Sequence, residues 1–200
     1  MLGVWNDRTM EAKSRMILEK YCSDYLWNME AIPIEKLIEI FGIELEYQHL
    51  TKYGQTILGK LICTDGITPY YDMESQEYMF LEVRANTIIV EARLLDQENQ
   101  GRYRFTLAHE LAHWLLHKEY IISAQNEAAY IDGTHSNKME KQADYFASAI
   151  LMPVAIIKKY YYSIHGKGYS KFEVIADMAE RFSVSKQAMQ IKLESHKILS

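Results

Sequence analysis

Apolar residues near the start of the chain recur at three- and four-residue steps, which is the spacing of an amphipathic helix. This pattern predicts a helix over residues 9–28. Pro33 suits the start of a helix and Gly42 suits its end, so a second, shorter helix is expected over residues 34–41. The chain is therefore expected to begin with two helices.

The next fifty residues carry the signals of β structure. Ile43, Leu45 and Tyr47 alternate with polar residues, as they would in a strand with one buried face. Later runs are rich in β-branched and aromatic residues, and Asp65-Gly66 is typical of a turn. Four strands are expected, over residues 43–48, 57–63, 78–83 and 87–92.

Helical spacing returns after a polar connection at residues 94–100. It predicts a helix over residues 106–117 and another over residues 138–151, which Pro153 ends. Two further short helices are expected in the last thirty residues. Helices, then a small sheet, then more helices is an α+β arrangement, and this is the predicted fold class.

The length of the chain fits one medium domain, or one domain plus a small appendage. Of the 200 residues 48% are hydrophobic and 24% are charged, which excludes disordered and collagen-like classes. The net charge of −5 argues against a general nucleic-acid binder. Cys22 and Cys63 indicate two reduced thiols. The chain shows no secretory signal, and its longest apolar run, residues 147–157, is too short to span a membrane, so we expect a cytoplasmic protein.

The strongest chemical signal is the segment His109-Glu110-Leu111-Ala112-His113, an HExxH pattern. On a helix, His109 and His113 lie about 40° apart on one face, and Glu110 flanks them at about 100°. Leucine and tryptophan side chains occupy the opposite arc, which can be buried against a sheet. Two neutral imidazoles at this spacing suit a tetrahedral zinc ion, and a catalytic zinc ion needs a third protein ligand and one position open to water.

The third ligand is expected downstream of this helix. A metzincin would have Gly and His at positions 116 and 119, but this chain has Leu116 and Glu119, so that class is excluded. Glu140 and Asp144 share one face of a separate predicted helix, beside small alanines that allow close helix packing. We expect Glu140 to complete a His/His/Glu site and Asp144 to accept the free N–H of a ligand histidine; the alternative is a solvated acidic edge. The other candidates are Glu119, Glu127, Asp132 and His135.

His117 lies on the same helical face as the paired histidines. It is about 12 Å along the helix axis from His109, which is too far to bind the same ion. We therefore expect His117 to cap the helix end or to hydrogen-bond nearby backbone.

Two sequence blocks resemble the ImmA/IrrE family of metallopeptidases. The first is RFTLAHELAHWLLH at residues 104–117, and the second has the pattern E-xx-AD-x-FA-xxx-LMP at residues 140–153. The resemblance implies a zincin-like fold, in which a small, mostly antiparallel sheet packs on the HExxH helix, and a gluzincin-type zinc site. It also implies cytosolic cleavage of helix-turn-helix repressors. The zinc ligands it implies are His109, His113 and Glu140, with Glu110 as the catalytic glutamate.

The end of the chain resembles the later part of a helix-turn-helix, with Ser185 capping the second helix. We expect a metallopeptidase domain over residues 1–165 and a helical extension over residues 166–200 that packs on it. The extension holds six Lys/Arg and four Asp/Glu, a net charge of +2, so direct DNA binding is not expected. Its predicted core positions are Ala179, Val184, Ala188 and Ile191.

Three functions follow from the sequence. The first is a zinc-dependent endopeptidase that cleaves a helix-turn-helix repressor or antitoxin-type regulator, with Glu110 moving the proton from water to the leaving amine. Manganese is an alternative metal, because a His/His/Glu site accepts both ions. The second is a regulator that binds the same partner without cleaving it, with the metal in a structural role. The third is a DNA-binding protein acting through its tail, which the acidic balance opposes.

Overall fold

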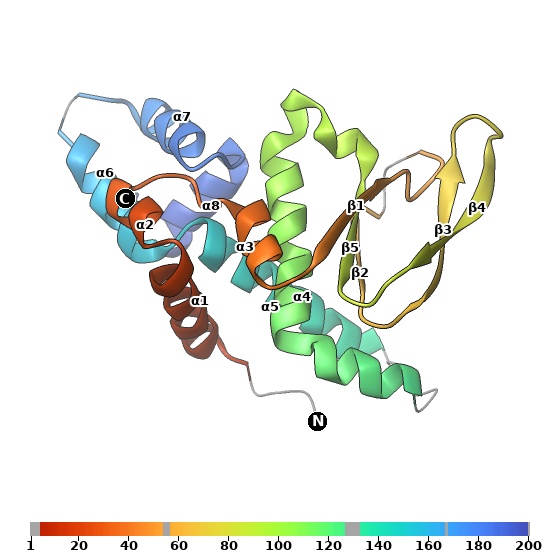
Figure 1. The fold of residues 1–200 in the computed structure, drawn as a ribbon. Coiled ribbons are helices and arrows are strands. Elements are labelled where there is room, and N and C mark those ends of the chain that lie inside the picture. Colours follow the sequence, from red (N-terminus) through yellow and green to blue (C-terminus); the bar gives the residue numbers. More distant parts are fainter. Residues whose placement is uncertain (1–4, 54–56, 127–132, 167, 200) are drawn as a thin grey trace.

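The computed structural model describes residues 5–53, 57–126, 133–166 and 168–199 (Figure 1). Helices and two small sheets occur together, so the predicted α+β class is confirmed. Within the described residues the helices are α1 (Asp7–Tyr21), α2 (Ser23–Asn28), α3 (Ile34–Ile40), α4 (Gln100–Asn126), α5 (Gly133–Leu151), α6 (Val154–Ile164), α7 (Lys171–Arg181) and α8 (Lys186–Ser195). The strands are β1 (Glu44–Gln48), β2 (Gly59–Ile62), β3 (Gly66–Asp72), β4 (Glu77–Val83) and β5 (Thr87–Glu91).

Strand β5 is the centre of the larger sheet, whose strand order is β1-β5-β2. It pairs with β1 in parallel and with β2 antiparallel. Ile88 and Val90 belong to the main core, whereas Ile89 joins a smaller cluster with Leu50 and Val83. Because both faces of β5 are covered, its apolar run is continuous rather than alternating. The sheet expected to be mostly antiparallel is thus a mixed one, with one parallel pairing.

Strands β3 and β4 form a separate antiparallel hairpin, in which Gly66 pairs with Val83. The predicted turn at Asp65-Gly66 is wrong in part, because Gly66 already belongs to β3, a strand that the pattern does not predict. Asp65 lies at the bend between β2 and β3, where its Oδ1 accepts a hydrogen bond from the N–H of Ala85 at 2.7 Å. Pro69 hides the strand signal, since proline is rare within strands and tolerated mainly at sheet edges.

Helix α4 carries the HExxH segment and stands between the strands and the helices α1, α7 and α8 (Figure 1). It has 27 residues, whereas the pattern predicts only residues 106–117. Leu107 and Leu111 are fully buried, as expected, but so are Ala108 and Ala112. Because β2, β5 and α5 all pack on α4, it lacks the one-sided apolar stripe that would predict its full length. Neither α4 nor any other described helix is apolar enough over a sufficient length to cross a membrane.

Two further helix boundaries differ from the prediction. The helix expected over residues 9–28 is two helices, which meet at the buried, non-helical residue Cys22. Pro153 ends one helix as predicted, but it is also the N-cap of α6, which the pattern misses. Proline lacks the N–H that a helix interior needs and is tolerated at the start of a helix, where that N–H would have no partner. Two short 3₁₀ turns, Ala92–Leu95 and Gln97–Asn99, overlap the polar connection at residues 94–100.

Helix α8 turns a different face inward from the one predicted. Its buried residues are Met189, Lys192 and Leu193, so Ile191 lies on the outer side with 58% of its surface exposed. The predicted core position of Ile191 is therefore wrong. Of the other predicted core positions, Ala179 is buried, and Val184 and Ala188 are half-buried.

Two arginines join the C-terminal helices to the N-terminal region. Arg104 on α4 donates hydrogen bonds to the backbone oxygens of Ser183 at 3.0 Å and Ile32 at 2.6 Å. Arg181 at the end of α7 donates to the backbone oxygen of Met29 at 2.7 Å. One hydrophobic core is continuous from α1 through α4 and α5 to α8. The division into a domain over residues 1–165 and an extension over residues 166–200 stays a prediction, and this core crosses it.

Gly101→Ala should destabilise the protein, because α4 meets the start of α8 at this glycine. A Cβ at residue 101 would lie 2.8 Å from the backbone nitrogen of Ser185, which caps α8 as predicted, and 3.1 Å from the carbonyl carbon of Val184. Overpacking against backbone costs about 1–3 kcal/mol, whereas alanine gains at most about 1 kcal/mol over glycine in a helix.

Urea unfolding should therefore give a lower free energy of unfolding for G101A than for the wild type. The matched control is Gly66→Ala, since a Cβ at residue 66 meets no atom within 4 Å. Wild-type stability of G101A would contradict the close contact between α4 and α8.

Candidate metal centre and active site

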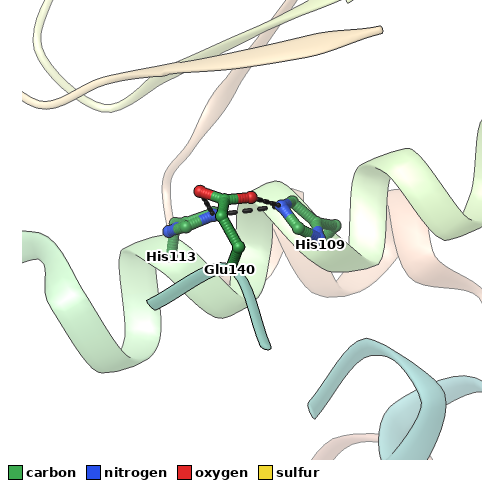
Figure 2. A group of neighbouring side chains, drawn as sticks. All are labelled: His109, His113 and Glu140. Atoms are coloured by element: carbon green, nitrogen blue, oxygen red, sulfur yellow. Dashed lines mark hydrogen bonds and ion pairs between the residues drawn. The ribbon is translucent and has the colours of Figure 1, made fainter. Parts of the chain in front are cut away.

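Three side chains from two helices converge on one point (Figure 2). His109 and His113 lie one turn apart on α4, with their Nε2 atoms 3.0 Å from each other. Glu140 on α5 places Oε2 at 3.1 Å from His109 Nε2 and Oε1 at 3.4 Å from His113 Nε2. The structure thus brings together the three residues that the sequence analysis selected as ligands.

The spacing of these donor atoms fits a tetrahedral metal ion. Ligands about 2.0–2.1 Å from zinc in tetrahedral directions lie about 3.3–3.4 Å from one another. The two imidazole nitrogens lie 3.0 Å apart, and each lies near a different oxygen of Glu140, at 3.1 and 3.4 Å, which is close to that value. One ligand atom from each of the three residues can be chosen so that all lie within 4.8 Å of one another. Two imidazoles and a carboxylate are also donors that zinc prefers. Half of the Glu140 side chain is exposed, so this centre is open to solvent on the side of α5.

Small residues allow α5 to approach α4 closely enough for this geometry. Ala143 and Ala147 of α5 are fully buried, as is Leu111 of α4, and all three belong to the main core. The i, i+4 spacing on α4 presents both imidazoles on the same side. Glu140 reaches them from α5 because its helix lies directly alongside.

Asp144 holds the His109 ring. Its Oδ1 lies 2.9 Å from His109 Nδ1, and a carboxylate can only accept, so Nδ1–H donates and Nε2 is left to face the other two donors. Burial by itself lowers the pKa of His109, but the hydrogen bonds to Asp144 and Glu140 raise it to about 10. Hydrogen bonds from His109 and His113 in turn hold the pKa of Glu140 well below its usual range. The site is therefore electrostatically coupled, with carboxylates placed to offset positive charge.

His117 differs from its prediction. It lies in the interior of α4 rather than near its end, and it is almost fully buried. Its Nδ1 lies 3.2 Å from His113 Nδ1, and its Nε2 lies 3.0 Å from Gln142 Oε1 on α5. Burial lowers the pKa of His117 to about 4. Its partners are thus side chains next to the metal centre, not backbone at a helix end.

Glu110 points toward strand β2. It is buried, and the backbone N–H of Leu61 is one of its partners. Burial raises the pKa of Glu110, while the nearby His113 and His109 oppose that rise. Gly59 is necessary here, because a Cβ on it would lie 2.7 Å from Glu110 Oε1. The Glu110 carboxylate therefore lies between helix α4 and strand β2.

The other candidate ligands do not join this group. Glu119 is exposed. Glu127 and Asp132 lie outside the described residues, as does the side chain of His135. Gly59, Gln142 and His117 are the residues around the site that sequence reasoning missed or misplaced. The one available signal is that His117 follows His113 at the same four-residue step that separates His113 from His109.

A groove of about 780 Å³ opens beside the metal centre, between α4, α5 and α8. Phe105 and Asp144 line it at the end nearest the centre, where the rings of Phe105 and His109 lie 6.4 Å apart. Met152, Ala188 and Ile191 are among its apolar lining residues. The outward position of Ile191 on α8 therefore contributes to a concave surface.

An HExxH helix packed against a small sheet, with a carboxylate supplied by the following helix, is a zincin-like arrangement. The sequence profile of the Peptidase_M78 family, the IrrE N-terminal-like domain, matches residues 69–194. The chain therefore belongs to this family of metallopeptidases, and the resemblance to ImmA/IrrE proteins is confirmed. No curated protein matches the chain.

Asp144→Ala should weaken zinc binding by about 10–100-fold, because it removes the acceptor that holds the His109 ring. Competition with a chromogenic chelator measures the zinc dissociation constant. Asp177→Ala on α7 is the matched control, since that carboxylate accepts a hydrogen bond from Tyr160 outside the metal centre. Equal zinc affinity in D144A and the wild type would show that the contact does not support the site.

Proposed function

We propose that this protein is a zinc-dependent endopeptidase that cleaves a helix-turn-helix repressor or an antitoxin-type regulator in the cytosol. The observation that carries the proposal is the convergence of two imidazoles from α4 and a carboxylate from α5, with ligand atoms within 4.8 Å of one another, next to the buried Glu110. Membership of a metallopeptidase family supports hydrolysis as the reaction. The repressor class of substrate rests on the resemblance of both sequence blocks to ImmA/IrrE peptidases.

In this proposal each side chain has one task. His109 and His113 bind the metal through Nε2 and Glu140 binds it through a carboxylate oxygen. When bound, zinc, or manganese in its place, supplies positive charge that polarises the scissile carbonyl and acidifies water. Glu110 accepts the proton that the attacking water loses and passes it to the nitrogen of the leaving amine. Asp144 keeps the His109 ring in the orientation that binding requires.

The groove beside the centre offers a place for part of a protein substrate. It is open, it is bounded by three helices, and its lining is largely apolar. An extended segment of a protein that passes the metal centre can bury apolar side chains in such a groove. The groove and the centre share Asp144, so a bound segment would lie next to the reacting peptide bond.

Two other functions are less well supported. A purely structural zinc site has four protein ligands, whereas the group found among the described residues has three. For DNA binding, helix α8 offers a poor surface. Lys192 is buried and lies 3.6 Å from Glu11, and the exposed Ile191 faces outward. A DNA-docking helix instead presents cations toward phosphates.

Glu110→Gln should retain zinc but lose at least about 100-fold in cleavage rate, because the amide cannot accept the proton from water. The substrate to use is a purified helix-turn-helix regulator, chosen from those encoded near this gene, incubated with the zinc-loaded protein and with a chelator-treated sample. Gel analysis measures cleavage and elemental analysis measures zinc. His109→Ala is the companion variant and should lose the metal itself. Cleavage by E110Q at the wild-type rate, or an intact repressor with the zinc-loaded wild type, would overturn the proposal.

Gly59→Ala should reduce cleavage more than it reduces zinc binding. The added Cβ would push against Glu110 Oε1 at 2.7 Å and against the Thr106 methyl at 2.7 Å, and would displace the carboxylate rather than the ligands. A shift of about 1 Å in a catalytic group can cost about 100-fold in rate. Cleavage assays and zinc titration on the same sample separate the two effects. Equal losses in both measurements would place Gly59 in the fold rather than in the catalytic geometry.

A further inference from the structure

A chain of hydrogen bonds runs from the backbone of Trp5 to the metal-facing ring of His113. Trp5 O accepts from Gln142 Nε2 at 2.8 Å, Gln142 Oε1 lies 3.0 Å from His117 Nε2, and His117 Nδ1 lies 3.2 Å from His113 Nδ1. We propose that His117, oriented by Gln142 and Trp5, is a positioning residue that fixes the tautomer in which His113 can bind metal. The inference rests on the proposed metal centre and deepens it.

The order of donors and acceptors along these hydrogen bonds is set at the end where Trp5 lies. A backbone carbonyl can only accept, so the amide nitrogen of Gln142 must face Trp5 O and its oxygen must face His117. Gln142 Oε1 can likewise only accept, so His117 Nε2 carries the proton. A neutral imidazole has one N–H, which leaves His117 Nδ1 as an acceptor.

The last link follows in the same way. Because His117 Nδ1 accepts, the proton between the two rings belongs to His113 Nδ1. His113 Nε2 is then unprotonated and presents its lone pair toward His109 Nε2 and Glu140. This is the form of histidine that binds a metal ion.

The reversed order of donors and acceptors along these hydrogen bonds would cost free energy. It would put an N–H on His117 Nδ1 facing His113, which would have to carry its own proton on Nε2, where the metal binds. It would also turn Gln142 Oε1 toward Trp5 O and place two acceptors 2.8 Å apart. His117 is 1% exposed and Gln142 is 5% exposed, so water cannot substitute for a lost partner. The chain therefore has one favourable proton order.

The anchor of the chain is itself held in place. Trp5 donates from Nε1 to the backbone oxygen of Leu116 at 3.2 Å, on the turn of α4 that carries His117. The two ligand histidines are thus oriented by different means. An exposed carboxylate, Asp144, holds His109, whereas a buried and uncharged chain holds His113.

The test compares zinc affinity in four full-length variants by chelator competition. His117→Phe removes the acceptor, and we expect zinc to bind about 10–100-fold more weakly. His117→Asn can accept the same bond through its amide oxygen and should recover most of that loss. Gln142→Leu removes the group that orients His117 and should weaken zinc binding in the same direction. His165→Phe, at an exposed histidine outside the site, is the control and should bind zinc as the wild type does.

Nitrogen-15 NMR of the histidine rings in the zinc-loaded wild type provides a readout that needs no variant. We expect a proton on His113 Nδ1 and on His117 Nε2, with His117 Nδ1 unprotonated. A proton on His117 Nδ1, or wild-type zinc affinity in H117F, would overturn the inference. If a variant does not fold, the NMR result on the wild type decides the matter.

These results separate the inference from the proposed function. Zinc binding with the expected proton order but no cleavage of the repressor would reject the proposed endopeptidase and leave the role of His117 intact. Cleavage with unchanged zinc affinity in H117F would reject the role of His117 alone. Absence of zinc binding by the wild type would reject both.

Discussion

The close packing of α5 against α4 is the constraint on which the site depends. Two of the three donor groups come from one helix, where their spacing is fixed by the helical turn, but the carboxylate of Glu140 must be brought in from the other. Alanines 143 and 147 make that approach feasible, because larger side chains would hold the helices apart. The same alanines belong to the hydrophobic core, so the stability of the fold and the geometry of the centre rest on one contact.

Polar groups next to the centre lie inside or beside this apolar core, and each has a partner. Among the described residues, no buried side-chain nitrogen or oxygen lacks a hydrogen-bond partner. Asp144 is hydrogen-bonded to His109, His117 is hydrogen-bonded to His113, and the N–H of Leu61 donates a hydrogen bond to Glu110. Since an unpaired buried polar group costs about 1–3 kcal/mol, these contacts leave little freedom to the rings and the carboxylate. The side chains of the candidate metal centre are therefore held in fixed orientations by the fold itself.

The C-terminal helices contribute to the site as well as to the fold. Gly101, Arg104 and Arg181 join them to α4 and to the N-terminal region, and α8 forms one wall of the groove beside Asp144. The family match extends through α8 to residue 194, in agreement with this continuity. The exposed Ile191, unexplained by core packing, lies on that wall.

Local patterns in the sequence determined the α+β class, the helix that carries His109 and His113, and the pairing of Glu140 with Asp144 on one face of a second helix. These features depend on residues within one or two turns of each other, and periodicity records them. Glu140 could be favoured over the other carboxylates, but only the packing of α5 placed it beside the imidazoles.

Only the tertiary structure decided which residues far apart in the sequence contact each other. The orientation of the His117 ring is set by Gln142, which donates a hydrogen bond to the backbone oxygen of Trp5, 137 residues away. Strand β3, helix α6 and the outward turn of Ile191 likewise depend on what packs against them rather than on their own pattern. Burial and hydrogen-bond partners are properties of the assembled fold, because they arise between segments whose proximity no local spacing encodes.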